Sequence, residues 1–161
     1  MTAAQYVGRT FDVVALGGAK SSGDVLLRTE LFGETNSGSV CTGIQKMAQR
    51  WITEFCTIRG SMPWHMRTRG TDFMTYLHSG LLRTEFDVQS VYATSAVQAR
   101  QSLSNEDTGT EPLDERFDYS ELTGIVLSPG RLELYVTLYS LAGDSRNIIL
   151  PIATTPANLV V

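Results

Sequence analysis

The hydrophobic residues of this chain change their spacing once, before the last third of the sequence. Between residues 44 and 55, apolar side chains recur at helical spacing, at Ile44, Met47, Ala48, Trp51 and Phe55. The opposite face of this predicted helix carries the polar residues Gln45, Arg50 and Glu54, which we expect to face solvent. In RLELYVTLYS (131–140), apolar and polar residues instead alternate, which is the period of a strand with one buried face. Helices followed by strands predict the α+β class.

Two further helices are expected before the strands begin. In TDFMTYLHSG (71–80), Thr71 is a suitable N-cap and a glycine ends the segment. In the stretch 84–104, Thr84 and Asp87 match a capping pair in which Asp replaces the usual Glu. Three helices therefore precede the strands.

The last part of the chain is expected to form a three-stranded antiparallel meander. The stretches 122–127 and 147–152 flank the alternating stretch 131–140, and the turn sequences SPG and AGD separate them. Leu134 and Val136 lie on the apolar face of the middle strand, and we expect that face to pack against the helical stripe that contains a tryptophan and a phenylalanine.

The first 38 residues contain strand-like stretches but too few apolar residues for a core of their own. The candidates are FDVVAL (11–16) and DVLLRTELF (24–32), with glycine- and serine-rich loops after each. The predicted organisation is an extended N-terminal arm (1–38), a core domain (39–153) and an extended C-terminal tail (154–161). The strands of the arm could pair with a neighbouring subunit or with the chain's own meander, and the sequence leaves both arrangements open.

Composition and cysteine spacing argue against several classes of protein. The formal net charge of −4 disfavours a nucleic-acid binder, which usually carries positive charge. No apolar run approaches the ~18 residues of a membrane helix. At the start of the sequence no charged leader precedes an apolar run, so we expect the protein to be made, and to stay, in the reducing interior of a cell. Cys41 and Cys56 are expected at opposite ends of one helix, beyond disulfide reach, and with His65 and His78 they show no zinc spacing. We expect two buried thiols, no metal and no cofactor.

The segment TIRGSMPWHMRTRGTDF (57–73) concentrates aromatic and basic residues between two glycines. Gly60 is expected to end a helix in a left-handed conformation, and Gly70 to allow a tight turn into the next helix. Trp64 and Met66 are expected to fold back on the core. Three arginines are expected to point outward, toward carboxylates of a partner: Arg59, Arg67 and Arg69. A solvated basic loop is the main alternative, and a phosphate site is disfavoured because no P-loop spacing is present.

Three groups of residues stand in a distinctive order over roughly residues 40–153. The first is a pair of glycine motifs formed by Thr57, Gly60, Ser61, Gly70, Thr71 and Asp72. The second is the triplet Asp114-Glu115-Arg116, between the last helix and the first strand of the meander. The third is the hydrophobic-proline-hydrophobic sequence Leu150-Pro151-Ile152, at the end of the meander.

This order resembles the GPW-type family of small baseplate wedge proteins in contractile-tailed bacteriophages, often called sheath initiators. The family usually has an aromatic residue where Arg69 stands. It also has a Glu-Pro-Arg triplet, whose arginine corresponds to Arg116, and this chain lacks the proline. The resemblance implies a structural subunit of the virion, not an enzyme, in the inner baseplate around the tail tube. It also implies six copies per virion, made in the host cytoplasm, with other wedge proteins, tail sheath protein and tail tube proteins as partners, and neither nucleic acid nor membrane. Arg116, with Asp114 and Glu115, would bind at an inter-subunit junction.

Two other functions are alternatives. Members of the family have been labelled lysozyme-like, and a glycoside hydrolase needs a carboxyl with a raised pKa in an apolar pocket beside a second, ionised carboxyl. The acid-rich stretch 104–121 is expected to be an exposed polar connector, which offers no such desolvation, and Glu30 and Glu54 show no partner in the sequence. A nucleic-acid-binding module would rest on the arginines around Trp64, and a single tryptophan in an acidic chain supports it poorly.

Overall fold

The computed structural model describes residues 9, 12–13, 24–26, 40–63 and 68–154. Its three helices are α1 (Ile44–Cys56), α2 (Phe73–His78) and α3 (Glu85–Glu106). The predicted capping box is confirmed at the start of α3, where Asp87 N donates to Thr84 Oγ1 at 3.1 Å and Thr84 N donates to Asp87 Oδ2 at 3.0 Å. These bonds pair two of the backbone donors that the first helical turn leaves free.

The predicted meander is also confirmed. Strands β4 (Phe117–Ser128), β5 (Arg131–Ser140) and β6 (Ser145–Ala153) pair antiparallel in sequence order. β4 begins five residues before the predicted stretch 122–127. Register shifts between Phe117 and Tyr119 and between Leu122 and Gly124 interrupt the alternation of β4, so its sequence does not show one continuous strand period.

Short N-terminal strands attach to the core. β1 (Asp12–Val13) pairs antiparallel with β3 (Val40–Cys41), and β2 (Asp24–Leu26) pairs in parallel with β6. The sheet order is therefore β2-β6-β5-β4. Of the two arrangements left open for the arm, β2 adopts the pairing with the chain's own meander, whereas β1 pairs with β3 at the start of the core domain. The remainder of the predicted strands 11–16 and 24–32, and the tail 155–161, lie outside the described residues.

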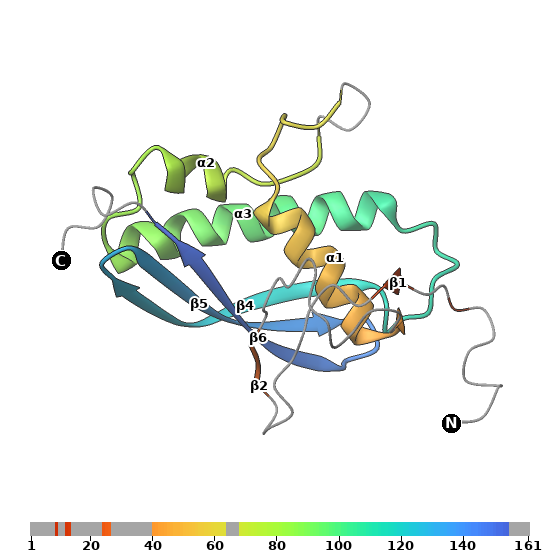
Figure 1. Cartoon of the computed structure of the whole chain (residues 1–161). Helices are drawn as coiled ribbons and strands as arrows, with labels where there is room; N and C mark the ends of the chain where they lie inside the picture. The colour runs from red at the N-terminus through yellow and green to blue at the C-terminus, as the bar shows by residue number, and fades with distance from the viewer. Residues whose placement is uncertain (1–8, 10–11, 14–23, 27–39, 64–67, 155–161) are drawn as a thin grey trace.

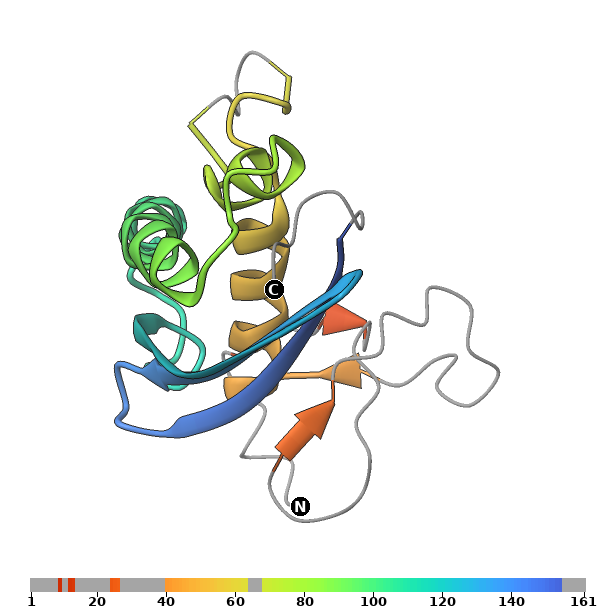
Figure 2. The same ribbon diagram turned by 90° about the vertical axis from the view of Figure 1, so that its left-hand side faces the viewer.

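The hydrophobic core lies between the helices and one face of the sheet (Figures 1 and 2). Trp51 and Phe55 stack with ring centroids 4.7 Å apart and are fully buried. Leu134 and Val136 are buried in the same cluster, as predicted. Glu54 was expected to face solvent, and this is wrong, because its side chain is only 1% exposed. Among the described residues, no helix combines the length and the apolar character needed to cross a membrane.

Candidate protein-binding site

The loop between α1 and α2 (residues 57–72, the α1–α2 loop) is closed at its base by backbone contacts. Ile58 and Thr71 form an isolated parallel bridge, in which Thr71 N donates to Thr57 O at 2.8 Å and Arg59 N donates to Thr71 O at 3.1 Å. Gly70 has a φ of +87°, and a Cβ at this position would lie 2.5 Å from Thr57 O. Only glycine fits this close approach of two backbone segments. The predicted tight turn at Gly70 is confirmed.

Two other predictions for this segment hold only in part. The Thr71 hydroxyl accepts a hydrogen bond from Phe73 N at 3.4 Å, as a capping oxygen does, and it also donates to Phe55 O at 2.6 Å, but Thr71 stands one residue before the N-cap position. The N-cap position belongs to Asp72, which makes no side-chain cap. Gly60 does have a positive φ of 80°, but α1 ends at Cys56, so Gly60 does not terminate the helix.

Glu54, near the end of α1, fixes the base of the α1–α2 loop. Its Oε1 accepts a hydrogen bond from Gly70 N, and its Oε2 lies 3.1 Å from Arg69 Nε. Arg69 Nε also lies 2.8 Å from Glu106 Oε1 at the end of α3. Arg69 was expected to point outward to a partner, but it pairs within its own chain, because a buried carboxylate requires compensating donors. Arg67, the second predicted arginine, lies outside the described residues.

The carboxyl group of Glu115 is fully buried where the segment before β4 meets the start of α1. Its Oε2 lies 2.8 Å from Lys46 Nζ, and its Oε1 accepts hydrogen bonds from the Thr42 hydroxyl and from Gly43 N, the latter at 3.2 Å. The expectation of an exposed polar connector is wrong for this residue. Burial alone would raise the pKa of the Glu115 carboxyl, but the bonds from Lys46, Thr42 and Gly43 outweigh it and hold the pKa below its ordinary value.

The neighbours of Glu115 in the triplet also have partners within the chain. Asp114 Oδ2 lies 2.7 Å from Arg9 Nη1, so a residue of the arm contacts the core at this point. Arg116 Nε lies 3.5 Å from Asp107 Oδ2, and Asp107 Oδ1 lies 3.4 Å from Arg50 Nη2. The Arg116 side chain is 27% exposed. The triplet therefore links the arm, α1 and the end of α3, and the Arg116 side chain keeps part of its surface accessible.

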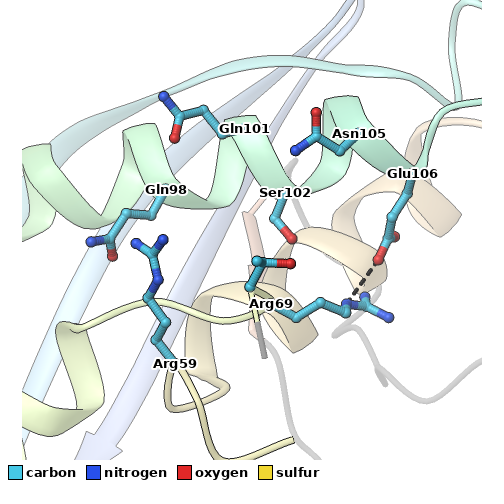
Figure 3. Close-up of a pocket in the computed structure, with 8 residues that line it drawn as sticks. Arg59, Arg69, Gln98, Gln101, Ser102, Asn105 and Glu106 are labelled. Atoms are coloured by element: carbon cyan, nitrogen blue, oxygen red, sulfur yellow. Dashed lines mark ion pairs between the residues drawn. The ribbon is translucent and has the colours of Figure 1, made fainter. Parts of the chain in front are cut away.

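A polar cleft of about 420 Å³ separates the α1–α2 loop from α3 (Figure 3). Arg59 is exposed and points from the loop toward α3, whereas Arg69 points toward Glu106. Within the described part of the chain, no carboxylate pairs with Arg59. The residues that line this polar cleft are Arg59, Thr68, Arg69, Gln98, Gln101, Ser102, Asn105 and Glu106.

A second depression, the α3–β4 groove, has a volume of about 450 Å³ and a more apolar lining. Its floor includes Tyr92, whose hydroxyl donates to Ser120 Oγ at 2.8 Å and whose pKa is raised by burial. Val97 and Tyr119 on its rim are 56% and 45% exposed. Because β4 is the outermost strand of the sheet, this groove runs beside a strand edge that pairs with no other described strand.

The remaining predicted residues are Pro151 and the two cysteines. Pro151 is exposed in β6, opposite Glu133 of β5, at the predicted end of the meander. Cys41 is buried and Cys56 is half-buried, and both thiols are free. Burial raises the pKa of the Cys56 thiol to about 11 and also raises the pKa of the Cys41 thiol, so neither is a reactive thiolate near neutral pH. In the described ranges, no group of three or more His, Cys, Asp or Glu side chains could hold a metal ion.

No family model, curated protein or solved structure matches this chain. Sequence reasoning did not identify two buried ionic residues: Lys46, which pairs with Glu115, and Glu54, which pairs with Arg69. It also missed a polar stripe on α3, although the spacing i, i+3, i+4, i+7 of its members was a usable signal for one helix face: Gln98, Gln101, Ser102 and Asn105.

Proposed function

We propose that this protein is a structural, non-enzymatic subunit of a contractile phage tail baseplate and acts by protein–protein assembly around the tail tube. The observation that carries the proposal is β4, a twelve-residue strand at the edge of the sheet beside the α3–β4 groove. The free N–H and C=O groups of an edge strand are a template for a strand of another chain. An added strand could place alternate apolar side chains in the groove.

The edge of β4 is only partly protected against such an addition. It contains neither lysine nor proline, two residues that commonly protect strand edges. Its two register shifts lie at the Phe117 end and near Gly124, which leaves continuous pairing with β5 from Gly124 to Ser128. Val126, in this regular part, is 43% exposed.

The residues that carry the resemblance to sheath initiators support the same proposal. The first glycine motif and the later Gly70-Thr71 pair meet at the base of the α1–α2 loop, although they are more than ten residues apart in sequence. Arg116 lies close to the start of β4 and keeps accessible surface. The proposal takes from that resemblance a position in the inner baseplate, with six copies per virion, among other wedge proteins, sheath protein and tube proteins.

The alternative of a glycoside hydrolase receives no support from the two buried glutamates. Glu54 is bound by Arg69 and a backbone N–H, and Glu115 is bound by Lys46. A general acid needs a raised pKa, whereas the pKa of Glu115 is lowered. Nucleic-acid binding is also disfavoured, because Arg69 and Arg116 already contact carboxylates that would repel phosphates.

Reconstitution with the sheath and tube proteins of the same phage tests the proposal. We expect the wild-type protein to start sheath polymerisation on tubes, as counted by negative-stain electron microscopy, and Val97→Asp to reduce that count at least tenfold, because it places a charge on the rim of the α3–β4 groove. Leu81→Asp is the matched control, since Leu81 is 55% exposed, close to the 56% of Val97, but lies outside the groove. Equal activity of Val97→Asp and Leu81→Asp would remove the groove from the proposal. Clearing of cell walls by the wild-type protein, lost in a single carboxylate variant that keeps its fold by circular dichroism, would replace it with the hydrolase.

A further inference from the structure

The face of α3 that lines the polar cleft has an unusual composition for its position. A helix face turned toward another element of the same chain is normally apolar. Here it consists of polar residues, two of which are used internally. Glu106 at its end pairs with Arg69, and Gln98 donates to Asp72 Oδ2 at 2.6 Å and accepts from Asp72 N at 2.9 Å. Gln101 and Asn105 are exposed and make no hydrogen bond with any described side chain. Their amides are available to a ligand.

The opposite wall of the polar cleft contributes one uncompensated cation. The charge of Arg69 is taken up by Glu54 and Glu106, which fixes this side chain as part of the wall. Arg59 follows the bridge at Ile58, so the closed base of the loop holds its backbone in place, and its guanidinium group reaches toward α3 (Figure 3). The cleft therefore offers a positioned guanidinium group on one side and free amides on the other.

We infer that the polar cleft binds an extended, carboxylate-bearing peptide segment of a partner protein. Arg59 pairs with the carboxylate, for which the guanidinium fork is geometrically matched. Gln101 and Asn105 bind the peptide backbone, because an amide side chain can donate to a carbonyl and accept from an N–H at once. The inference rests on the proposed assembly function, since it requires a partner protein, and it adds the chemistry of that partner. It also divides the predicted arginines, giving Arg59 a binding role and Arg69 a positioning role.

Charge and size favour a peptide carboxylate over a phosphate. A nucleic-acid strand presents a repeated charge and is held by several cations, but among the described residues that line the cleft only Arg59 is a cation that is not already paired. A dianionic phosphate would also meet Glu106 on the wall. The volume of about 420 Å³ lies at the low end of ligand sites, which suits a few residues of extended chain.

Titration of the full-length ¹⁵N-labelled protein tests the inference. The probe is the capped pentapeptide acetyl-Gly-Ser-Glu-Gly-Ser-amide, compared with the same peptide containing glutamine. We expect saturable shifts of the side-chain signals of Arg59, Gln101 and Asn105, with the glutamine peptide about fivefold weaker, as for loss of one partly exposed ion pair. Arg59→Gln should abolish the preference for glutamate. The matched control Arg100→Gln should keep it, since Arg100 is an exposed arginine of α3 that pairs with Asp118 at 2.9 Å outside the polar cleft.

Equal binding of the two peptides, or an unchanged preference in Arg59→Gln, would overturn the inference. Saturation of the same signals by inorganic phosphate at lower concentration than by the glutamate peptide would overturn it in favour of a phosphate site. The titration uses the isolated protein, so its result is separate from sheath assembly. A cleft that prefers glutamate in a protein that never starts sheath would refute only the baseplate function. A protein that starts sheath but shows no such preference would refute only the cleft.

Discussion

Lys46 and Glu115 form an ion pair inside the protein, with Lys46 Nζ 2.8 Å from Glu115 Oε2 and the carboxyl side chain fully buried. The two residues are 69 positions apart in the sequence. They join the first turn of α1 to the segment that leads into β4. Their interaction therefore couples the helical layer to the sheet.

Replacement of Glu115 should destabilise the fold strongly. Glu115→Gln removes the buried carboxylate that faces the Lys46 ammonium, and breaking such a buried pair on one side costs about 3–5 kcal/mol. Urea unfolding followed by circular dichroism measures this loss. The double variant Lys46→Met with Glu115→Gln should recover part of it, because no buried charge is then left unpaired. A loss below about 1 kcal/mol for the single variant, as at an exposed ion pair, would contradict the burial of this pair.

The same carboxyl predicts a pH dependence of stability. The pKa of Glu115 is lowered on folding from an ordinary value of 4.5, so the folded state binds fewer protons than the unfolded state in this range. Its contribution is thus fully present above pH 4.5 and is lost as the pH falls through the lower folded-state pKa. The free energy of unfolding should fall more steeply with acid in the wild type than in Glu115→Gln. Parallel curves for the two proteins between pH 5 and 3 would disprove this linkage.

Two glycines of the α1–α2 loop should differ in their tolerance of alanine. Both have positive φ, +80° at Gly60 and +87° at Gly70. A Cβ at Gly60 would meet nothing within 4 Å, whereas at Gly70 it would lie 2.5 Å from Thr57 O. We expect Gly60→Ala to cost about 1 kcal/mol from backbone strain alone, and Gly70→Ala to cost about 2 kcal/mol more because the loop base must open. Melting temperatures measure the difference, and equal values would show that the loop closes in another way.

Arg116 should matter more for assembly than for folding. Its 3.5 Å contact with Asp107 is long, and a lysine can keep the charge, so Arg116→Lys should shift the unfolding free energy by less than about 1 kcal/mol. Loss of the planar fork should nevertheless impair bidentate contacts with a neighbouring subunit. Particle yield after complementation of a deletion phage measures this, with Arg131→Lys as the control at an exposed arginine of β5. A wild-type yield from Arg116→Lys would remove this residue from the junction.

Local patterns in the sequence predicted the elements that depend on near neighbours. The capping box joins Thr84 to Asp87, three positions later, and the alternation in β5 depends only on which side chains face the core. The start of β4 was missed because two register shifts break its period. Glu54 was assigned to solvent because its partner Arg69 follows 15 residues later, across a loop whose closure no local pattern shows. Glu115 was assigned to an exposed connector because it stands among other acidic residues, and its partner Lys46 is 69 positions away in the sequence.

The ionic contacts of α1 have a mechanical consequence. Lys46 in the first turn is tied to Glu115 before the sheet, and Glu54 in the last turn is tied to Arg69 and Gly70 in the α1–α2 loop. A helix of this length spans about 20 Å and is stiff along its axis. Force applied to the α1–α2 loop would therefore be transmitted along the axis of α1 to the segment before β4. If the proposed role in a contractile tail holds, a subunit of this design would transmit load from the α1–α2 loop to the sheet instead of absorbing it.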